Sequence, residues 1–402
     1  MAREPSDRDS AMTGRAGRYI RQPTGYRAFI PSPLPPDPPI VITPELQMLL
    51  SEADQALGRL DGSILTLPHP DMFVFMYIRK EAVLSSQIEG TQSSLQDVLA
   101  AEARILSPDA PKDVSEVVNY VRAMNYGLHR LSDLPVSVRL IREIHAELLR
   151  GVRGSHLTPG ELRTSQNWIG PQGCTLNEAV FVPAPPHEVA GHLGALELFL
   201  HSDTRLPQLI RIGLAHAQFE TIHPFLDGNG RVGRLLIAFL LCERGILQKP
   251  VLYLSHYFKQ HLQDYYGCLQ SVRDHGTWEE WLAFFLEGVA KVGRQAARTV
   301  RDILALRESH RLMVTEHLGR AAANGHRVLD MLYEQPIVSV ETVKELTGTT
   351  YQAANELVSR FVDKGLLVEF TGRSRNRRFM YQRYIDLFAG SDGGDDTPDI
   401  IS

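Results

Sequence analysis

Cysteine is scarce in this sequence of 402 residues. The three cysteines, Cys174, Cys242 and Cys268, are odd in number and lack the spacing of metal ligands. The pattern therefore provides neither a disulfide framework nor a zinc site. Such usage is typical of reduced thiols, and we expect a cytoplasmic protein.

Long apolar runs are also missing. No run approaches the roughly 20 residues that a membrane-spanning helix needs, and residues 235–242, which come nearest, predict a buried helix. The first residues are polar and charged, without the apolar centre of a secretory signal. We therefore expect a soluble intracellular protein with no membrane partner.

Neither sign of charge dominates, because the formal net charge is −5 and charged residues make up 22% of the chain. This balance gives no global reason to expect nucleic acid as a partner, although a local basic patch can exist under it. A hydrophobic content of 43% is ordinary for a globular protein. The length is sufficient for two or three domains with a large buried core.

The most informative stretch runs from His223 to Arg234 and reads His-Pro-Phe-Leu-Asp-Gly-Asn-Gly-Arg-Val-Gly-Arg. Residues 209–220 have helical apolar spacing, and Pro224 cannot continue that helix. Residues 231–243 predict a second helix. The Asp-Gly-Asn-Gly turn therefore joins two helices.

The turn and the second helix together predict a phosphate-binding site. Gly228 and Gly230 let backbone N–H groups approach an anion closely, and the helix presents its positive N-terminal dipole to the same anion. Arg231 and Arg234 are three positions apart, so they share the face of the first turn and can both bind a polyphosphate. Each feature is common by itself, but their combination within so short a stretch indicates a functional site.

Two further side chains of the stretch can supply chemistry. His223 is the only one that can take up a proton near neutral pH, which makes it the candidate general base. Asp227 offers oxygen ligands suited to Mg²⁺, which proteins usually hold with one or two carboxylates together with substrate phosphates.

The stretch matches the signature His-Pro-Phe-x-[Asp/Glu]-Gly-Asn-Gly-Arg-x-x-Arg at every specified position, and the chain thereby resembles the Fic (filamentation induced by cAMP) family. The resemblance implies a mainly α fold with a helical Fic core. It also implies transfer of AMP from ATP to a Ser, Thr or Tyr hydroxyl of a target protein, or of the chain itself, with release of pyrophosphate. His223 is then the catalytic base, and Asp227 holds Mg²⁺. The implied nucleotide-binding residues are Asp227, Gly228, Asn229, Gly230, Arg231 and Arg234, with the Asn229 side chain and Arg231 on the α- and β-phosphates and Arg234 on the γ-phosphate.

A second motif, Ser85-x-x-x-Glu89-Gly90, lies at the end of a predicted amphipathic helix over 72–88. Gly90 is suited to end that helix. A carboxylate at a helix C-terminus opposes the dipole, so the residues alone allow either a solvated Glu89 or one that pairs with an arginine. The motif resembles the inhibitory motif of Fic proteins that carry it N-terminal to the core (class II). That resemblance implies that Glu89 pairs with Arg234 and occupies the space that the ATP γ-phosphate needs.

Two more segments predict β structure. Residues 179–183 form a short strand-like run, which by itself indicates a connecting hairpin. In the Fic family this position is a β-hairpin flap that aligns the target by main-chain pairing. Residues 326–388 have the pattern of a winged helix-turn-helix, a module that contacts DNA or mediates protein contact, and the residues leave both open. Its predicted wing carries the basic residues Arg373, Arg375, Arg377 and Arg378.

These patterns divide the chain into five parts. A proline-rich segment (1–40) is expected to lie extended over the surface. It precedes an N-terminal helical region with the inhibitory helix (41–128) and the Fic catalytic core (129–300). A connector helix and the winged helix-turn-helix follow (301–388). An acidic tail (389–402) is expected to be disordered.

Two other functions compete with AMP transfer. In some Fic enzymes the same residues serve the reverse reaction, which is hydrolytic removal of AMP from a modified protein. A DNA-binding regulator with a nucleotide-sensing Fic core is the alternative from another class. The presence of His223 and Asp227 argues against it, because a sensor needs neither a base nor a metal ligand. A homodimer is compatible with the pattern, and the identity of the target protein is left open.

Overall fold

The computed structural model describes residues 14–65, 70–103, 111–171, 173–373 and 375–389. These residues are mainly helical, as the sequence predicted. The predicted acidic tail beyond residue 389 and the first 13 residues of the proline-rich segment lie outside the described residues. No helix in the described ranges is long and apolar enough to cross a bilayer.

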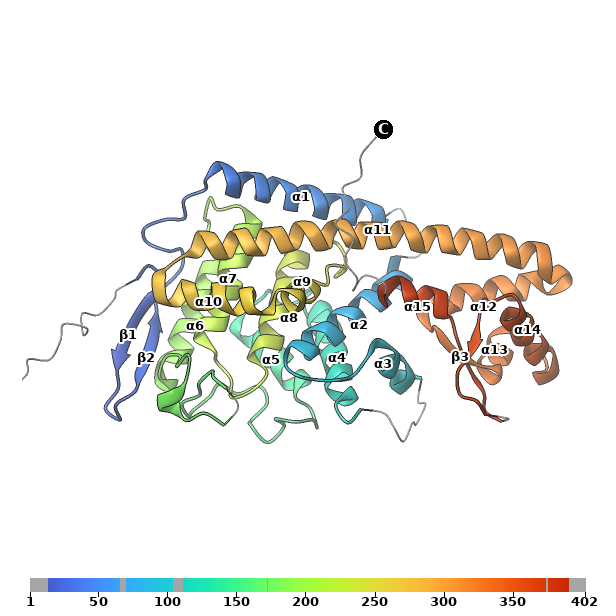
Figure 1. Cartoon of the computed structure of the whole chain (residues 1–402), viewed down its shortest axis with the longest axis horizontal. Helices are drawn as coiled ribbons and strands as arrows, with labels where there is room; N and C mark the ends of the chain where they lie inside the picture. Colours follow the sequence, from blue (N-terminus) through green and yellow to red (C-terminus); the bar gives the residue numbers. More distant parts are fainter. Residues whose placement is uncertain (1–13, 66–69, 104–110, 172, 374, 390–402) are drawn as a thin grey trace, which may run out of the picture.

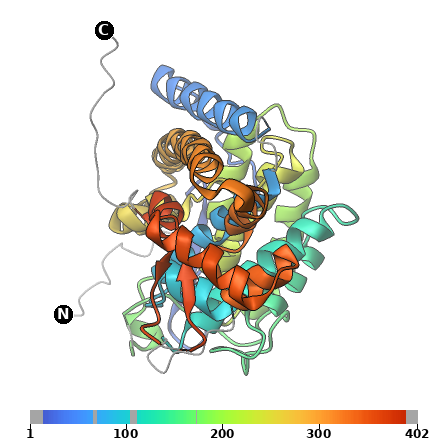
Figure 2. The same ribbon diagram turned by 90° about the vertical axis from the view of Figure 1, so that its right-hand side faces the viewer.

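Two long helices, α1 (Pro44–Leu65) and α11 (Trp278–Leu318), run side by side along the molecule (Figures 1 and 2). Helix α1 buries one face, on which leucines recur at helical spacing. Gly293 of α11 lets the two backbones approach closely, because a Cβ there would lie 3.1 Å from the Ala56 Cβ. The pair forms one wall of the core.

Helix α11 replaces two predicted helices. The pattern indicated one helix over 278–297 and a polar connector over 298–323, but the structure has a single helix that ends at Leu318. Its second half keeps a narrow buried stripe that includes Val300 and Ile303. This stripe packs against the neighbouring helices, so the helix continues although most of its surface there is polar.

The centre of the molecule is formed by α7 (Gln208–Ile222) and α8 (Asn229–Glu243). All residues from 209 to 222 are buried, and so is most of α8. Both helices are largely apolar on every side, which suits a position surrounded by other helices. The helices packed against them are α2 (Pro70–Ile88), α4 (Val114–Arg130), α5 (Val138–Leu148), α6 (Val189–His201), α10 (Leu262–His275) and α11.

Two short helices depart from the predicted pattern. Helix α9 (Ser255–Gln260) and α10 replace one helix predicted over 257–272, since the chain breaks at His261. Helix α3 (Leu95–Glu102) was not predicted. It begins with a capping box, in which the Ser94 and Asp97 side chains each accept a hydrogen bond from the other residue's N–H.

The N-terminal segment forms a hairpin that the sequence did not reveal. Strands β1 (Gly17–Arg21) and β2 (Arg27–Pro31) pair antiparallel, with Tyr19 opposite Phe29. The prediction of an extended segment over 1–40 is therefore incomplete. Phe29 is fully buried and its N–H donates to the Val182 carbonyl at 2.9 Å, so the hairpin supports the segment that follows residue 179.

Residues 179–183 form less β structure than expected. Phe181 makes a single β-bridge with Ile169. Two hydrogen bonds hold it, from Ile169 N–H to Phe181 O at 2.8 Å and from Phe181 N–H to Ile169 O at 3.0 Å. The 3₁₀ turns η1 (Leu176–Glu178) and η2 (Pro186–Glu188) flank the segment.

The C-terminal unit has the predicted order of elements through residue 380. Its strands form one antiparallel sheet in the order β3-β5-β4. Helix α15 was not predicted, and it contacts α11. Assignment of this unit to the winged helix-turn-helix class stays a prediction. Its elements are η3 (Gly319–Ala321), α12 (Ala322–Glu334), β3 (Ile337–Ser339), α13 (Val340–Thr347), α14 (Tyr351–Asp363), β4 (Val368–Glu369), β5 (Arg378–Met380) and α15 (Gln382–Ala389).

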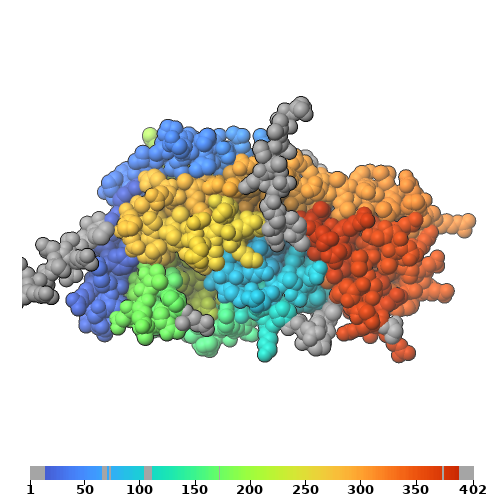
Figure 3. Space-filling view, viewed as in Figure 1, coloured from blue at the N-terminus to red at the C-terminus, as the bar shows by residue number. Residues whose placement is uncertain are grey.

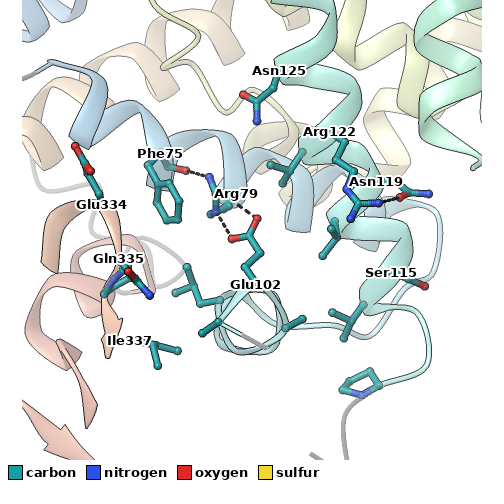
Figure 4. A pocket seen from close by; sticks show the side chains of 18 of the residues that line it. Phe75, Arg79, Glu102, Ser115, Asn119, Arg122, Asn125, Glu334, Gln335 and Ile337 are labelled. Atoms are coloured by element: carbon teal, nitrogen blue, oxygen red, sulfur yellow. Dashed lines mark hydrogen bonds and ion pairs between the residues drawn. The ribbon is translucent and has the colours of Figure 1, made fainter. Parts of the chain in front are cut away.

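The C-terminal unit forms one end of the molecule, beside the N-terminal helical region (Figure 3). A cleft of about 1260 Å³ lies between them and is lined by residues of α2, α3, α4 and the loop before β3 (Figure 4). Arg79 of α2 pairs with Glu102 of α3 at 2.6 Å on the side of the cleft that the N-terminal helical region forms. The cleft thus borders the helix that carries the predicted inhibitory motif.

Candidate active site

His223 lies immediately after the last residue of α7, where Pro224 prevents the helix from continuing. It adopts a left-handed conformation (φ 49°, ψ 61°), and its N–H donates to the Phe219 carbonyl at 3.0 Å. The Nδ1 atom lies 3.3 Å from the Glu220 carbonyl. Because a carbonyl can only accept, Nδ1 carries the proton and Nε2 keeps its lone pair.

The surroundings of His223 favour its neutral form. Burial, together with the guanidinium groups of Arg273 and Arg163, lowers the pKa of His223 to about 3. The imidazole is therefore unprotonated at neutral pH and can accept a proton.

The turn after His223 leads directly into α8. Gly228 caps the helix with a positive φ of 79°, a conformation that glycine adopts without strain. The Asn229 side chain shapes the loop through Phe225, because Oδ1 accepts its N–H and Nδ2 donates to its carbonyl, both at 2.8 Å. The amide NH2 group has two donors, so one N–H of Nδ2 is left besides the backbone N–H of Asn229. The predicted role of this side chain in phosphate binding stays a prediction.

Gly230 lies in the first turn of α8, where backbone N–H groups have no partner within the helix. A Cβ at this position would overlap the Glu89 Oε1 atom and approach the Arg234 Nη1 atom at 3.0 Å. The missing side chain thus leaves a space that an oxygen atom of an anionic group fills. In this structure the Glu89 carboxylate fills it.

The predicted inhibitory residues lie around Arg234. Its Nη2 atom is 2.6 Å from the Glu89 Oε1 atom, and its Nε atom donates to the Ser85 Oγ atom at 2.7 Å. The Ser85 carbonyl accepts a further bond at 3.0 Å. Gly90 ends α2 with a φ of 93° and turns the chain away. The structure therefore brings the two motifs together, as the resemblance implied.

Charge stabilises this pair. Burial alone would raise the pKa of Glu89, but the adjacent Arg234 guanidinium outweighs burial and lowers it. Burial opposes the charged form of Arg234 as well, and the Glu89 carboxylate nevertheless raises the pKa of Arg234. Both groups are ionised at neutral pH.

Arg231 points to other partners. It is 1% exposed, and its guanidinium lies 3.2 Å from the Glu116 Oε2 atom and 3.5 Å from the Asp227 Oδ1 atom. The two guanidinium groups bind different carboxylates here, and joint binding of one polyphosphate by Arg231 and Arg234 stays a prediction. Arg231 instead fixes the carboxylate of Asp227.

Asp227 is placed to bind a cation. Its Oδ1 atom accepts the Gly228 N–H at 2.6 Å, and its side chain is 31% exposed. Gly154 faces the other oxygen, and a Cβ there would lie 2.5 Å from Oδ2. Among the described residues no group of three or more His, Cys, Asp or Glu side chains could hold a metal. A single open carboxylate fits Mg²⁺ that takes its remaining ligands from phosphates and water.

Sequence reasoning missed three residues that support the turn. The His145 ring stacks on Phe225 with a centroid distance of 3.7 Å. Its Nδ1 accepts the Gly160 N–H at 2.8 Å, so Nε2 donates to the Asp227 carbonyl at 3.0 Å. Burial lowers the pKa of His145 to about 4, which keeps it neutral. These contacts join α5 to the turn, and no spacing in the sequence indicated them.

The other two missed residues are Glu220 and Arg163, and each is a hydrogen-bond partner of His223. Glu220 is buried, and its Oε1 atom has no hydrogen-bond partner within the described part of the chain. Burial raises the pKa of Glu220 to about 7, although Arg234 opposes this. Arg163 donates from Nε to the His223 carbonyl at 2.9 Å. A Glu three residues before the signature was the only sequence signal for either.

Taken together, these groups can bind an anion at the start of α8 and accept a proton beside it. The anion would contact backbone N–H groups and Arg234, and His223 offers an unprotonated Nε2 atom. Such an arrangement suits transfer of a phosphoryl-type group to a hydroxyl, in which positioning and charge neutralisation dominate.

Two family models match the chain. The N-terminal model of the Fic/DOC family matches residues 47–129, and the Fic/DOC family model matches residues 135–241. They cover the helix with the second motif and the helices on both sides of the turn.

Curated relatives are similar over the same region. The chain is 30% identical over 181 residues to a "Probable protein adenylyltransferase" of Aquifex aeolicus, which is 44% of this chain and 51% of that protein. It is 29% identical over 161 residues to "Protein adenylyltransferase Fic" of Drosophila willistoni, which is 39% of this chain and 28% of that protein. The chain therefore spans about half or less of the length of these relatives.

Among solved structures, a Fic family protein from Desulfovibrio desulfuricans aligns with a TM-score of 0.56 at 19% identity. The alignment covers 85% of this chain and 97% of that chain. At this level of identity the likeness concerns the fold.

Proposed function

This chain is a Fic family protein, and on that basis we propose that it transfers AMP from ATP to a hydroxyl group of a target protein. The observation that carries the proposal is the position of the Glu89 carboxylate, which contacts Arg234 at 2.6 Å in the space left open by Gly230. This place suits a phosphate, and the neutral His223 imidazole is near enough to interact electrostatically with the Glu89 carboxylate that fills it. The relatives named as protein adenylyltransferases support the same reaction.

ATP would bind across the first turn of α8. The backbone N–H groups of Asn229 and Gly230, the Asn229 side chain and the Arg231 guanidinium would hold the α- and β-phosphates. Gly228, whose N–H donates to Asp227, would let the backbone approach them closely. Arg234 would hold the γ-phosphate after Glu89 leaves it. Bound in this way, the nucleotide would present its α-phosphorus to His223.

The proposed reaction is a displacement at the α-phosphorus. The His223 Nε2 atom accepts the proton of a Ser, Thr or Tyr hydroxyl as its oxygen attacks. A new phosphorus–oxygen bond joins AMP to the target, and the bond to the β-phosphate oxygen breaks. Pyrophosphate leaves with the electron pair of that bond.

Asp227 would hold Mg²⁺, which neutralises charge on the phosphate oxygens when it is bound. Arg231 and the Gly228 N–H restrict the Asp227 carboxylate to one orientation. This orientation leaves the Oδ2 atom toward Gly154, where no side chain blocks it.

Glu89 would inhibit transfer by occupying Arg234. Its ion pair competes with the γ-phosphate, so ATP binds without correct alignment of its α-phosphorus. Ser85 helps to hold the pair, because it accepts two hydrogen bonds from the same guanidinium. Removal of the Glu89 side chain is then expected to release the activity.

Glu89→Gly tests this proposal directly. We expect the variant to incorporate AMP into itself at least tenfold faster than the parent protein, because Arg234 becomes free for the γ-phosphate. Intact-protein mass spectrometry after incubation with Mg²⁺ and ATP would detect the added AMP.

The controls separate the base and the ion pair from general effects. Adding His223→Ala should abolish incorporation in either background. Glu52→Gly is the matched control. Glu52 lies in α1, which contributes no residue to the site, and the change removes only an exposed ion pair with Arg294 at 3.2 Å. This variant should behave as the parent protein. Equal rates for Glu89→Gly and the parent would refute the inhibitory role, and incorporation without His223 would refute the base.

Removal of AMP is the second candidate activity, because Glu89 lies close enough to His223 to influence its charge. A modified protein incubated without ATP distinguishes the two, since only removal would restore the unmodified mass. DNA contact through the C-terminal unit stays a prediction. Arg377 bonds to Asn355 of α14 at 2.9 Å, whereas Arg373 and Arg375 are exposed.

A further inference from the structure

Arg163 is a buried arginine whose hydrogen bonds to described residues all end on backbone carbonyls. It is 2% exposed, and burial lowers the pKa of its guanidinium to about 10, which leaves it charged at neutral pH. Burying a charge without a carboxylate is costly, so a group in this position is expected to stabilise something specific. Its partners show what that is.

The guanidinium links the base to the segment after residue 179. The Nε atom donates to the His223 carbonyl at 2.9 Å. The Nη2 atom donates to the Ala184 carbonyl at 2.5 Å and lies 3.4 Å from the Ile222 carbonyl. One rigid, planar group therefore binds both the end of α7 and Ala184, which directly follows the segment 179–183 that the family resemblance assigns to target alignment.

Residues 163–167 donate hydrogen bonds to the backbone of the chain after α7. The Arg163 N–H donates to the Pro224 carbonyl at 3.0 Å. The Asn167 Nδ2 atom donates to the Phe225 carbonyl at 2.7 Å and to the His223 carbonyl at 3.3 Å. Three successive carbonyls, from 223 to 225, thus receive hydrogen bonds from this one segment.

The conformation of His223 explains why these hydrogen bonds are needed. Residues other than glycine rarely adopt positive φ values, and His223 has a φ of 49°. The carbonyls at the end of α7 also carry the negative end of the helix dipole, which a buried cation stabilises. Arg163 supplies both the hydrogen bonds and the charge.

We propose that Arg163 is a positioning residue for the base: it fixes the left-handed backbone of His223 and keeps the imidazole in register with the segment 181–184. The inference rests on the proposed function for its kinetic consequence, but its structural consequence can be measured without any activity. Lysine keeps the charge but cannot bridge the His223 and Ala184 carbonyls with one planar group.

The first test is kinetic and uses the Glu89→Gly background. We expect Arg163→Lys and Arg163→Gln to lower kcat for AMP incorporation at least tenfold, because the imidazole loses its alignment. KM for ATP should change less than threefold, since the proposed phosphate contacts lie on α8. Lysine should retain more activity than glutamine, because it keeps the charge at the end of α7.

The second test is spectroscopic and uses the full chain with its native Glu89. Nitrogen-15 NMR of labelled histidine should show His223 protonated on Nδ1, assigned by comparison with His223→Ala. In Arg163→Lys the bond to the Glu220 carbonyl is expected to loosen, and the signal should move toward an average of both tautomers.

Arg211 provides a matched control. It is also a buried arginine that donates only to carbonyls at a helix end, at 3.0 Å to Phe199 and at 2.7 Å to Leu200. Arg211→Lys should lower thermal stability without changing kcat, KM or the His223 signal. Equal kcat and an unchanged His223 signal in Arg163→Lys would overturn the inference.

The two proposals fail in different ways. If Glu89→Gly incorporates no AMP, the proposed function fails, and the NMR signal still decides the role of Arg163. If Glu89→Gly is active and Arg163→Lys in that background has the same kcat, the positioning role of Arg163 is refuted and the proposed function still holds. Should Arg163→Gln prove insoluble, Arg163→Lys decides.

Discussion

At the scale of single residues, Gly230 controls what the first turn of α8 can accept. The turn offers backbone N–H groups and the Arg234 guanidinium, and both lie within reach only because position 230 has no side chain. The Glu89 carboxylate occupies the space in this structure. The same space would receive a phosphate in the proposed reaction, so under that proposal the glycine serves both inhibition and catalysis.

Gly230→Ala, made in the Glu89→Gly background, should weaken ATP binding at least tenfold. The added methyl group would narrow the space and crowd the Arg234 Nη1 atom, which a Cβ would approach at 3.0 Å. Thermal stability should rise slightly at the same time, because alanine favours a helix over glycine. Isothermal titration calorimetry with Mg²⁺ and ATP measures the affinity. Gly194→Ala in α6, where a Cβ would meet nothing within 4 Å, is the control. An unchanged Kd for the 230 variant would contradict the anion site.

At the scale of elements, the site depends on the contact between α7 and α8. Gly233 of α8 allows it, since a Cβ there would overlap the Glu220 Oε1 atom. His216 of α7 is buried and lies 2.9 Å from both the Gly233 carbonyl and the Tyr265 hydroxyl. Nδ1 donates to the carbonyl, so in the neutral ring Nε2 accepts from the Tyr265 hydroxyl.

Acid should destabilise this contact through His216. Burial lowers the pKa of His216 to about 3 in the folded protein, against about 6.5 when unfolded, so the unfolded state binds more protons between these values. Its contribution to stability is complete above pH 6.5 and is lost as the pH falls. At pH 5 the loss is about 2 kcal/mol.

Urea unfolding of the parent and of His216→Gln at pH 7 and pH 5 measures this effect. The parent should lose about 2 kcal/mol more than the variant between the two pH values. Glu220, whose pKa is raised to about 7, acts in the opposite direction in both proteins, and its effect cancels in the comparison. An equal loss in both proteins would show that His216 is not the titrating group.

At the scale of the whole molecule, the C-terminal unit is joined to the helix that carries the inhibitory motif. Phe388 of α15 is 2% exposed and packs against Tyr77 of α2, with a ring-centroid distance of 5.3 Å. The Lys80 Nζ atom of α2 donates to the Phe388 carbonyl at 2.7 Å. Residues more than 300 positions apart in the sequence thus pack together, so the C-terminal unit shares a core with α2.

Phe388→Ala should detach α15 from α2. Truncation of a buried phenylalanine costs about 3–5 kcal/mol, and hydrogen exchange should show reduced protection of both helices. Leu312→Ala is the control, because Leu312 lies on α11 and is 53% exposed. Unchanged protection of α2 in Phe388→Ala would mean that the two parts fold independently.

Much of the fold followed from local patterns. Pro224 predicted the break between α7 and α8, and Gly90 predicted the end of α2, because proline and glycine act on their immediate neighbours. The capping box before α3 was present and overlooked. Pairing of β1 with β2 and the continuity of α11 had no local signal.

The sequence by itself determined the signature between α7 and α8, with its candidate base, its glycine turn and its carboxylate, since these lie within one short stretch. The tertiary structure decided which charges meet. Arg234 pairs with Glu89, which is 145 residues away in the sequence, and Arg231 pairs with Glu116, which is 115 residues away. Arg163 donates to the His223 carbonyl, 60 residues away. The resemblance anticipated the first of these contacts and nothing anticipated the other two. Such contacts depend on how the apolar faces of distant helices pack, and residue spacing along a single chain carries no record of that packing.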